Sequence, residues 1–420
     1  MEKLKIIGEN RLYGEIEVST AKNAVLPILA ASILIDGVVE ISEFPNFSDC
    51  AIMLQILENF NSKTIKSKTT LKIDNSSIKS CVVETELAEK MRSSFFAFGA
   101  MLARCGKAIF AYPGGCKIGA RPIDMHIKAF KELGIEITEK HGYIYAERKQ
   151  FNGGVIYLDF PSVGVTENII MLASTLSGIT VIKNPAKEPE IVDLQNFLNK
   201  AGARIEGAGT DVITIQGTNC LLKNVSYRCI GDRIIAGTYA IATASCGGLV
   251  KLKNVNPQHL QDLIGKLRKA DLCVIEGNQN ITIIAEKRPK SIPIIETLPF
   301  PNFPTDLQPQ LSVLQCISEG NSVIVENIFE SRLSYVSQLI KMGAKIKVKN
   351  NIAFVEGVSN LLGAEVYAPD LRAGAGLVIA GLIAKGYTTI HNVEYIDRGY
   401  DQIELDLRKL GANIVREKNS

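Results

Sequence analysis

Residues 372–412 read RAGAGLVIAGLIAKGYTTIHNVEYIDRGYDQIELDLRKLGA, and this stretch holds one copy of the pattern that decides the fold. A basic residue, Arg372, opens an apolar helix, and Gly386 closes it with left-handed backbone. The β-branched run 388–390 then predicts a strand. Apolar residues three and four apart predict a second, amphipathic helix over 402–410. The pattern indicates a small α/β unit.

The same plan occurs six times along the chain, with successive helix starts between 67 and 74 residues apart. Solenoid repeats usually run 20–50 residues, so this longer period favours α/β subdomains grouped as two domains of three. The domain boundary is expected between residues 226 and 231. The first helices are expected to open near Lys22, Arg92, Thr166, Arg233, Thr305 and Arg372. The closing glycines, each expected at a helix C-cap, are Gly37, Gly106, Gly178, Gly247, Gly320 and Gly386.

Composition excludes several classes of protein. The chain has 420 residues, is 46% hydrophobic and 22% charged, and carries a formal charge of only +3. It therefore predicts a packed globular protein that is not a dedicated binder of nucleic acid or of a membrane surface. No apolar stretch reaches the ~20 residues that span a bilayer, and no signal peptide opens the sequence. Nine cysteines without a Cys-x-x-Cys pair, and only four histidines, predict reduced thiols in the cytoplasm and no metal site.

An unusual loop follows the second repeat's first strand: residues 112–126 read YPGGCKIGARPIDMH. Three glycines and two prolines there predict an exposed connection. Cys116 lies beside Lys117 and Arg121, and nearby cations favour a reactive thiolate. The residues alone leave open both a chemical role and an ordinary loop cysteine. Cys105, among apolar residues, is expected to be a small buried hydrophobe.

A second unusual segment, residues 298–308, reads LPFPNFPTDLQ. Its three prolines predict an extended approach to a helix whose first turn contains Asp306. Two interpretations remain open at this point. The carboxylate caps the helix, or it acts as a general base toward a substrate hydroxyl.

Cations recur at helix starts and in loops, where packing of the repeats around a common centre would bring them together to bind carboxylate or phosphate. No phosphate-binding Gly-x-x-x-x-Gly-Lys-Ser/Thr or Gly-x-Gly-x-x-Gly loop occurs. Any phosphate would therefore be held by these side chains and helix ends. The cations are Lys22, Arg92, Arg121, Arg372 and Arg398.

Taken together, seven segments make the chain resemble the UDP-N-acetylglucosamine 1-carboxyvinyltransferases (UDP-N-acetylglucosamine enolpyruvyl transferases). The resemblance runs from Leu4 to about Ile414, and the loop around Cys116 is its most specific part. The other segments are 21–24, 162–164, 188–193, 303–308, 370–373 and 396–400.

The resemblance implies a fold of two similar domains. Each is an inverted α/β barrel (an alpha/beta prism) of three βαβαββ repeats, and the active site lies in the interdomain cleft. The implied domains are residues 21–230, and residues 1–20 together with 231–420.

The resemblance also implies a reaction: the enolpyruvyl group of phosphoenolpyruvate passes to the 3′-hydroxyl of UDP-N-acetylglucosamine by addition and elimination, and phosphate is released. In bacteria this is the first committed step of peptidoglycan synthesis. Cys116 matches the proposed acid at C3 of phosphoenolpyruvate and the target of the antibiotic fosfomycin. Asp306 matches the proposed base.

The same resemblance implies the binding residues. Lys22, Arg121 and Arg398 match the phosphoenolpyruvate site, Arg372 assists them, and Asn23 lies beside the reacting sugar. Phe160 and Ile235 depart from the family pattern, which has lysine and glutamate there. The residues that match the UDP-sugar site are Arg92, Arg121, Pro122, Ile123, Asp124, Met125, Ser162, Val163, Gly164, Asp306 and Ile328.

No cofactor or metal is implied, and a cytoplasmic monomer is expected, with two small-molecule substrates and neither nucleic acid nor membrane as a partner. Two alternatives remain. One is the related EPSP synthase of aromatic biosynthesis, which shares the fold but lacks the cysteine loop. The other is a non-catalytic paralogue that binds the UDP-sugar, against which the pair Cys116 and Asp306 argues.

Overall fold

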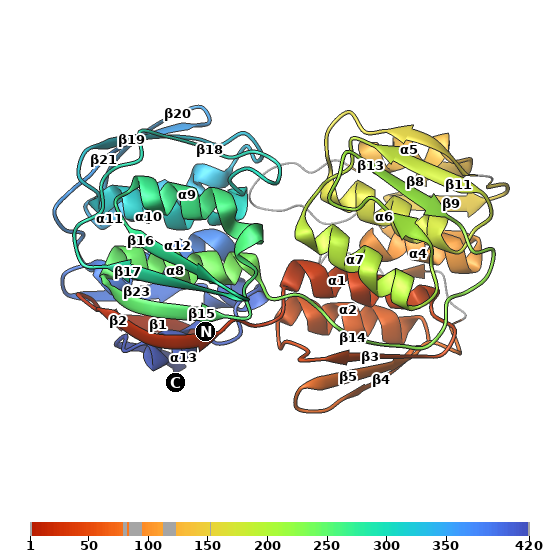
Figure 1. Ribbon diagram of the computed structural model, residues 1–420, viewed down its shortest axis with the longest axis horizontal. Coiled ribbons are helices and arrows are strands. Elements are labelled where there is room, and N and C mark those ends of the chain that lie inside the picture. The colour runs from red at the N-terminus through yellow and green to blue at the C-terminus, as the bar shows by residue number, and fades with distance from the viewer. Residues whose placement is uncertain (1, 79–81, 84–94, 112–122, 152, 419–420) are drawn as a thin grey trace. The chain divides into compact units, whose positions relative to one another are not determined.

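The computed structural model describes residues 2–78, 82–83, 95–111, 123–151 and 153–418. These residues form two compact units (Figure 1). The C-terminal unit contains the described residues of 1–19 and 231–420, and the N-terminal unit contains those between 20 and 230.

Each unit contains three four-stranded sheets with the same pairing pattern. One edge strand runs parallel to its neighbour, and the remaining pairs are antiparallel. In the N-terminal unit, the first sheet has the strand order β14 (Val225–Arg228), β3 (Val38–Ser42), β5 (Thr70–Asp74) and β4 (Lys63–Lys66). The second sheet has the order β6 (Val82–Val83), β7 (Lys107–Ala111), β9 (Tyr143–Arg148) and β8 (Ile135–Lys140). The third sheet has the order β10 (Gly153–Tyr157), β11 (Ile179–Lys183), β13 (Val212–Gln216) and β12 (Ile205–Glu206). In the C-terminal unit, one sheet has the strand order β22 (Glu365–Tyr367), β23 (Tyr387–His391), β1 (Glu2–Ile7) and β24 (Ile414–Lys418). Another has the order β16 (Cys273–Gly277), β17 (Asn280–Ala285), β15 (Gly248–Lys253) and β2 (Leu12–Glu17). The third has the order β18 (Ile294–Glu296), β19 (Asn321–Val325), β21 (Ile352–Glu356) and β20 (Lys345–Lys349).

The sixth repeat is completed by the beginning of the chain. Strand β1 lies between β23 and β24, and Leu4 pairs with Ile390 on one side and with Arg416 on the other. Strand β2 forms the parallel edge beside β15. The two ends of the chain therefore share one sheet, in which β1 is an interior strand and β24 is an edge strand.

Two kinds of helix fill each unit. The first helix of each repeat is buried almost all round, and α8, α10 and α12 contact one another in every pairing (Figure 1). The second helix buries one face only. The N-terminal unit contains α1 (Lys22–Ala31), η1 (Ser32–Leu34), α2 (Ser48–Asn59), α4 (Phe96–Cys105), α5 (Asp124–Glu132), α6 (Val163–Ser174) and α7 (Pro189–Lys200). The C-terminal unit contains α8 (Arg233–Cys246), η3 (Pro257–Leu260), α9 (Gln261–Lys269), η4 (Thr305–Leu307), α10 (Gln308–Ile317), η5 (Arg332–Tyr335), α11 (Val336–Lys341), α12 (Leu371–Ile383), η6 (Val393–Arg398) and α13 (Ile403–Lys409).

In the N-terminal unit, α4 packs against both α1 and α6. At the contact with α6, the Gly99 N–H donates to Asn168 Oδ1 over 2.9 Å. A Cβ at position 99 would lie 2.5 Å from the Asn168 carbonyl oxygen, so only glycine allows this close approach.

The six closing glycines differ in position from the prediction. All six have positive φ, as expected. However, only Gly106 and Gly247 occupy a helix C-cap. The others lie beyond the cap, and all six directly precede a strand. Their positive φ therefore turns the chain into the sheet. The left-handed residues that follow the C-caps of the second helices are Asn61, Gly134, Gly202, Asp271, Gly343 and Gly411.

One predicted helix start needs correction, because the helix expected near Thr166 begins at Val163. Helix α6 begins at Val163 because the Ser162 side chain accepts from the Val165 N–H and caps it there. Helix α12 begins at Leu371 because Asp370 caps it, and α10 begins after the 3₁₀ turn η4. The second helix of a repeat is followed by a hairpin and then by an edge strand.

All seven described cysteines are free thiols. Cys105 is half-buried, so the expectation of a buried side chain is wrong. The reason is its position as the last residue of α4, at the edge of the core. None of the helices among the described residues is both long and apolar enough to cross a bilayer.

Candidate active site

The segment 298–305 brings Asp306 to the start of α10. Phe303 is fully buried and anchors the turn, and the Leu298 N–H donates to its carbonyl oxygen over 3.1 Å. Pro304 is extended, and the chain then enters η4. Asp306 lies in the first turn of η4, and no side-chain hydrogen bond is made at the N-cap residues of η4 and α10, Pro304 and Leu307.

The Asp306 carboxylate instead bridges two arginines. Its Oδ1 accepts from Arg332 Nη2 over 2.7 Å, and its Oδ2 accepts from Arg372 Nη2 over 2.9 Å. Both arginine side chains are almost fully buried, whereas the Asp306 side chain is 26% exposed. The carboxylate is therefore the part of this cluster that faces outward.

Burial opposes the charge on Arg372, but Asp306 and further anionic groups outweigh it and raise the pKa of this guanidinium. Asp370 supports the arrangement by capping α12, with its Oδ1 accepting from the Arg372 N–H over 2.9 Å. The same oxygen lies 3.6 Å from Arg332 Nη1. Two carboxylates thus hold two buried guanidiniums in place.

Arg332 was not among the sequence candidates. Besides Asp306, it donates to the Thr305 carbonyl oxygen from Nε and Nη2, over 3.2 and 3.0 Å. It opens η5. No local spacing identifies it, because its partner lies 26 residues away.

Ile328 lies beside this cluster. Glu326 accepts from the Ile328 N–H over 2.9 Å and from the Thr305 hydroxyl over 3.0 Å. One buried carboxylate therefore ties the half-buried Ile328 to the residue that precedes Asp306.

Arg398 ends η6, two residues before the buried Tyr400. The Arg372 guanidinium lies 5.8 Å from the Tyr400 ring centre, and the Tyr400 hydroxyl lies 2.8 Å from the Thr238 hydroxyl. The neighbouring Asp397 accepts two hydrogen bonds from Arg416, over 2.8 and 2.9 Å. These contacts fix the segment that carries Arg398.

In the N-terminal unit, Lys22 is the first residue of α1 and is buried. Its Nζ lies 2.7 Å from Oδ2 of the buried Asp49. Asn23, next in α1, is half-buried. The predicted position of Lys22 at a helix start is confirmed.

Two of the predicted sugar-site segments lie together in this unit. Ile123 precedes α5, Asp124 and Met125 open it, and 162–164 lead into α6. A Cβ at Gly164 would lie 3.3 Å from His126 Nε2, so the two helix starts are in contact. Arg92, Cys116, Arg121 and Pro122 lie outside the described residues.

The departures from the family pattern occupy different environments. Phe160 is 45% exposed, so it can be exchanged without loss of core packing. Ile235 is buried in the first turn of α8, where its N–H donates to Asp232 Oδ1 over 3.0 Å.

The motif 188–193 contributes buried carboxyl groups to α7. Burial raises the pKa of Glu167, in α6, well above its usual range, and nearby Glu190 and Glu188 raise it further. Asp193 accepts from the Tyr227 hydroxyl over 2.7 Å and from the Ile230 N–H over 3.3 Å. Within the described residues, no three His, Cys, Asp or Glu side chains cluster as a metal site would require.

The buried Asp193 predicts a pH-dependent stability. Burial raises its pKa from 3.8 to about 6, although the bonds from Tyr227 and Ile230 oppose the rise. Between these values the folded chain holds more protons than the unfolded chain, so this stabilisation is lost as pH rises through 6. Relative to Asp193→Asn, the wild-type free energy of unfolding should fall by up to about 3 kcal/mol across that window.

Urea titrations read by hydrogen exchange in residues 189–230, at about pH 4 and about pH 7, measure this difference. The exposed Asp211, replaced by asparagine, is the matched control and should show no such dependence. A pH-independent difference between wild type and Asp193→Asn would contradict the prediction.

Comparison with known proteins defines the class first. The EPSP synthase (3-phosphoshikimate 1-carboxyvinyltransferase) family matches residues 6–407. The enolpyruvyl transferase NikO from Streptomyces tendae aligns with a TM-score of 0.87 at 23% identity, over 99% of this chain and 98% of its own. EPSP synthase from Acinetobacter baumannii aligns with a TM-score of 0.75 at 18% identity, over both whole chains. The chain is therefore an enolpyruvyl transferase by family, and the expected fold class is confirmed.

The sequence relatives narrow this further. UDP-N-acetylglucosamine 1-carboxyvinyltransferase 2 of Caldanaerobacter subterraneus subsp. tengcongensis is 48% identical over 416 residues, 99% of this chain and 100% of its own. UDP-N-acetylglucosamine 1-carboxyvinyltransferase of Clostridium botulinum is 46% identical over 418 residues, 99% and 100% of the two chains. The chain belongs to the UDP-N-acetylglucosamine 1-carboxyvinyltransferase family, and the resemblance inferred from the sequence is confirmed.

Proposed function

We propose that this protein transfers the enolpyruvyl group of phosphoenolpyruvate to the 3′-hydroxyl of UDP-N-acetylglucosamine. The observation that carries the proposal is the likeness over the full length, at 48% identity, to a transferase of that name. The products are the 3-O-enolpyruvyl ether and phosphate, as at the entry to peptidoglycan synthesis in bacteria.

The chemistry has two halves. In the addition, the hydroxyl oxygen bonds to C2 of phosphoenolpyruvate while C3 gains a proton and the hydroxyl loses one. In the elimination, C3 loses a proton and the C2–phosphate bond breaks, which restores the double bond. The proposal assigns the acid at C3 to Cys116 and the base at the hydroxyl to Asp306. Each such role is typically worth about 10² to 10⁴ in rate.

The contacts of Asp306 support its role as the base. A carboxylate that accepts from two guanidiniums is stabilised as the anion, which is the form that can take a proton. The same two bonds make it a weak base at rest. Proton transfer therefore requires one arginine to exchange its bond to Asp306 for a bond to the incoming anionic substrate.

The cations supply the charge that two anionic substrates need. Lys22, Arg121 and Arg398 are proposed to bind phosphoenolpyruvate, and the buried Arg372 is proposed to assist them. The UDP-sugar is assigned to Arg92, Arg121–Met125, Ser162–Gly164, Asp306 and Ile328, with Asn23 beside the reacting hydroxyl. We also propose that the protein acts in the cytoplasm as a monomer.

Release of phosphate tests the proposal. Phosphoenolpyruvate and UDP-N-acetylglucosamine are mixed with the reduced protein near neutral pH, and phosphate is measured. Shikimate 3-phosphate in place of the UDP-sugar separates this activity from that of EPSP synthase. Absence of phosphate release with the UDP-sugar would overturn the proposal. If the sugar still bound, that result would favour a non-catalytic sugar-binding protein.

Arg332 is expected to position Asp306. Arg332→Lys keeps the charge but loses the fork that joins the Thr305 carbonyl to the Asp306 carboxylate. We expect kcat to fall by about 10², because a displacement of about 1 Å at the reacting centre costs that much, with KM for the UDP-sugar changed by less than about threefold. Arg408→Lys, on the exposed face of α13, is the control. A change confined to KM would show that Arg332 acts in binding instead.

A further inference from the structure

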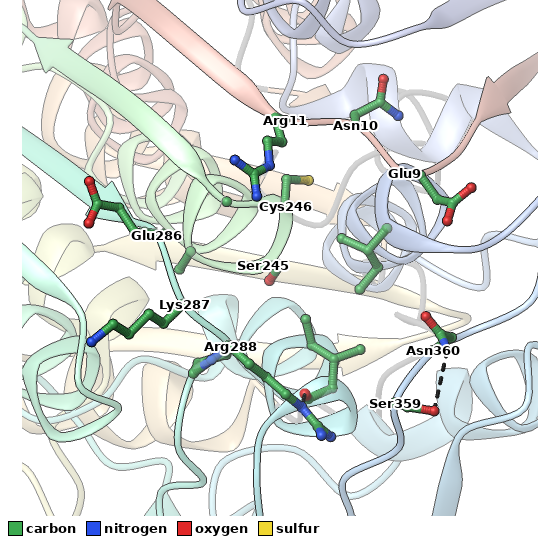
Figure 2. A pocket seen from close by; sticks show the side chains of 16 residues that line it. Glu9, Asn10, Arg11, Ser245, Cys246, Glu286, Lys287, Arg288, Ser359 and Asn360 are labelled. Carbon is green, nitrogen blue, oxygen red and sulfur yellow. Dashed lines mark hydrogen bonds between the residues drawn. The ribbon is translucent and has the colours of Figure 1, made fainter.

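The C-terminal unit contains a pocket at the end opposite to Asp306. It has a volume of about 360 Å³ and lies where α8, α10 and α12 finish, at Cys246, Ile317 and Ile383 (Figure 2). The same helices begin beside Arg233, Asp306 and Arg372. Because α12 has 13 residues, its two ends lie about 20 Å apart. The pocket is thus separate from the cluster described above.

The pocket is held open by side chains that satisfy the helix ends. Arg288 donates to the carbonyl oxygens of Ile317, Ser318 and Val358, over 2.7, 3.2 and 2.8 Å. Asn10 donates to the Leu382 carbonyl oxygen over 3.1 Å. The carbonyls of Ile317 in α10 and Leu382 in α12 are therefore already bonded within the protein.

The rim of the pocket carries unneutralised positive charge. The ion pairs of the described residues do not include Arg11, Lys287 or Arg288, and Arg288 is bonded to neutral carbonyls. Figure 2 shows Arg11 and Arg288 on opposite sides, with Cys246 and Ser245 between them. Glu9 and Glu286 lie at the far sides of the opening. The pocket lining therefore carries three cations against two carboxylates, and the C-terminal ends of three helices add partial negative charge.

In the N-terminal unit, an arginine also donates to carbonyl oxygens at helix ends, but its guanidinium is not accessible. There Arg104 donates to the carbonyl oxygens of Ile33, Ile35 and Asn75, over 2.7, 2.9 and 2.8 Å. Its side chain is only 8% exposed, whereas Arg288 is exposed at the pocket rim. Support of helix ends alone does not require an open pocket, so the opening at Arg288 needs another explanation.

We propose that this pocket binds a small organic anion, with a carboxylate on the Arg11 guanidinium and an apolar body against Ala244, Ile317 and Ile383. A guanidinium pairs with a carboxylate through two parallel hydrogen bonds. The volume lies within the range of small-molecule sites, and the lining mixes apolar residues with a larger number of polar and charged ones.

Methyl NMR of the full-length protein, with ¹³C-labelled isoleucine δ1 methyls and no substrates, tests the site. Benzoate is the probe, benzamide is its uncharged counterpart, and inorganic phosphate is an anion without an apolar body. We expect benzoate to shift the Ile317 and Ile383 methyls saturably. Arg11→Gln should weaken this binding at least tenfold, and the exposed Arg408→Gln should leave it unchanged.

Four outcomes would overturn the proposal. They are the absence of a saturable shift with benzoate, unchanged binding in Arg11→Gln, equal binding of benzamide, and equal binding of phosphate. Equal binding of benzamide would show that the carboxylate is not recognised. Equal binding of phosphate would show that the apolar body is not recognised. Binding is measured without turnover, so failure of the site leaves the transferase proposal untouched, and the reverse also holds.

Discussion

Replacing Asp306 by asparagine is expected to lower kcat for phosphate release by about 10² to 10⁴, the usual value of a general base. The amide keeps the size of the side chain but cannot take the hydroxyl proton. It also turns an N–H donor toward one of the two guanidiniums that the carboxylate now binds. The measurement is the steady-state rate with both substrates saturating.

This variant also removes the anion between Arg332 and Arg372, which are almost fully buried. Breaking a buried pair on one side is strongly destabilising, so unfolding must be measured alongside the rate. Asp306→Ser, which removes the same charge, shows whether stability and rate fall together. Asp262→Asn, which breaks a helix-surface pair with Lys266, is the control. A kcat above about one tenth of wild type in a folded Asp306→Asn would exclude this residue as the base.

Cys116 gives the second large effect. Cys116→Ser is expected to lose most of its turnover, and Cys116→Asp is expected to retain it. An aspartic acid can donate a proton to C3 of phosphoenolpyruvate, whereas a serine hydroxyl is far too weak an acid. The same range of about 10² to 10⁴ applies to the loss in serine. Equal activity in both variants would argue against a proton donor at this position.

Alkylation by fosfomycin provides an independent readout. We expect mass spectrometry to find the adduct on Cys116, formed faster with the UDP-sugar bound. The exposed Cys220 and Cys273 are internal controls for simple accessibility, and the half-buried Cys105 is a control for the adjoining helix. An adduct on any of these three instead would show that the reactive thiol has been misassigned.

The repeat plan could be predicted because helix and strand periodicities are local. Strand β23 lies where the β-branched run 388–390 predicted it, and α13 matches the amphipathic stretch 402–410 closely. The glycines were found but partly misplaced, since a positive φ is required wherever the chain turns sharply, at a helix cap or before a strand.

The candidate site could be predicted only in part. Residue type and the resemblance singled out Asp306 and Arg372, but not that they are bonded to each other across 66 residues. Arg332 was missed because an isolated arginine in a surface-like stretch carries no local signal. The pocket beyond α8, α10 and α12 has no sequence signature at all, since its lining comes from segments between residues 9 and 383.

By itself, the amino-acid sequence determined the six α/β repeats, the family and the residue types available for acid, base and anion binding. Patterns of this kind depend on neighbours within a few turns of helix or a single strand. Only the tertiary structure decided that β1 completes the last sheet, and that Asp306 lies between two buried guanidiniums. These pairings join residues far apart along the chain, and burial, not sequence spacing, selects them.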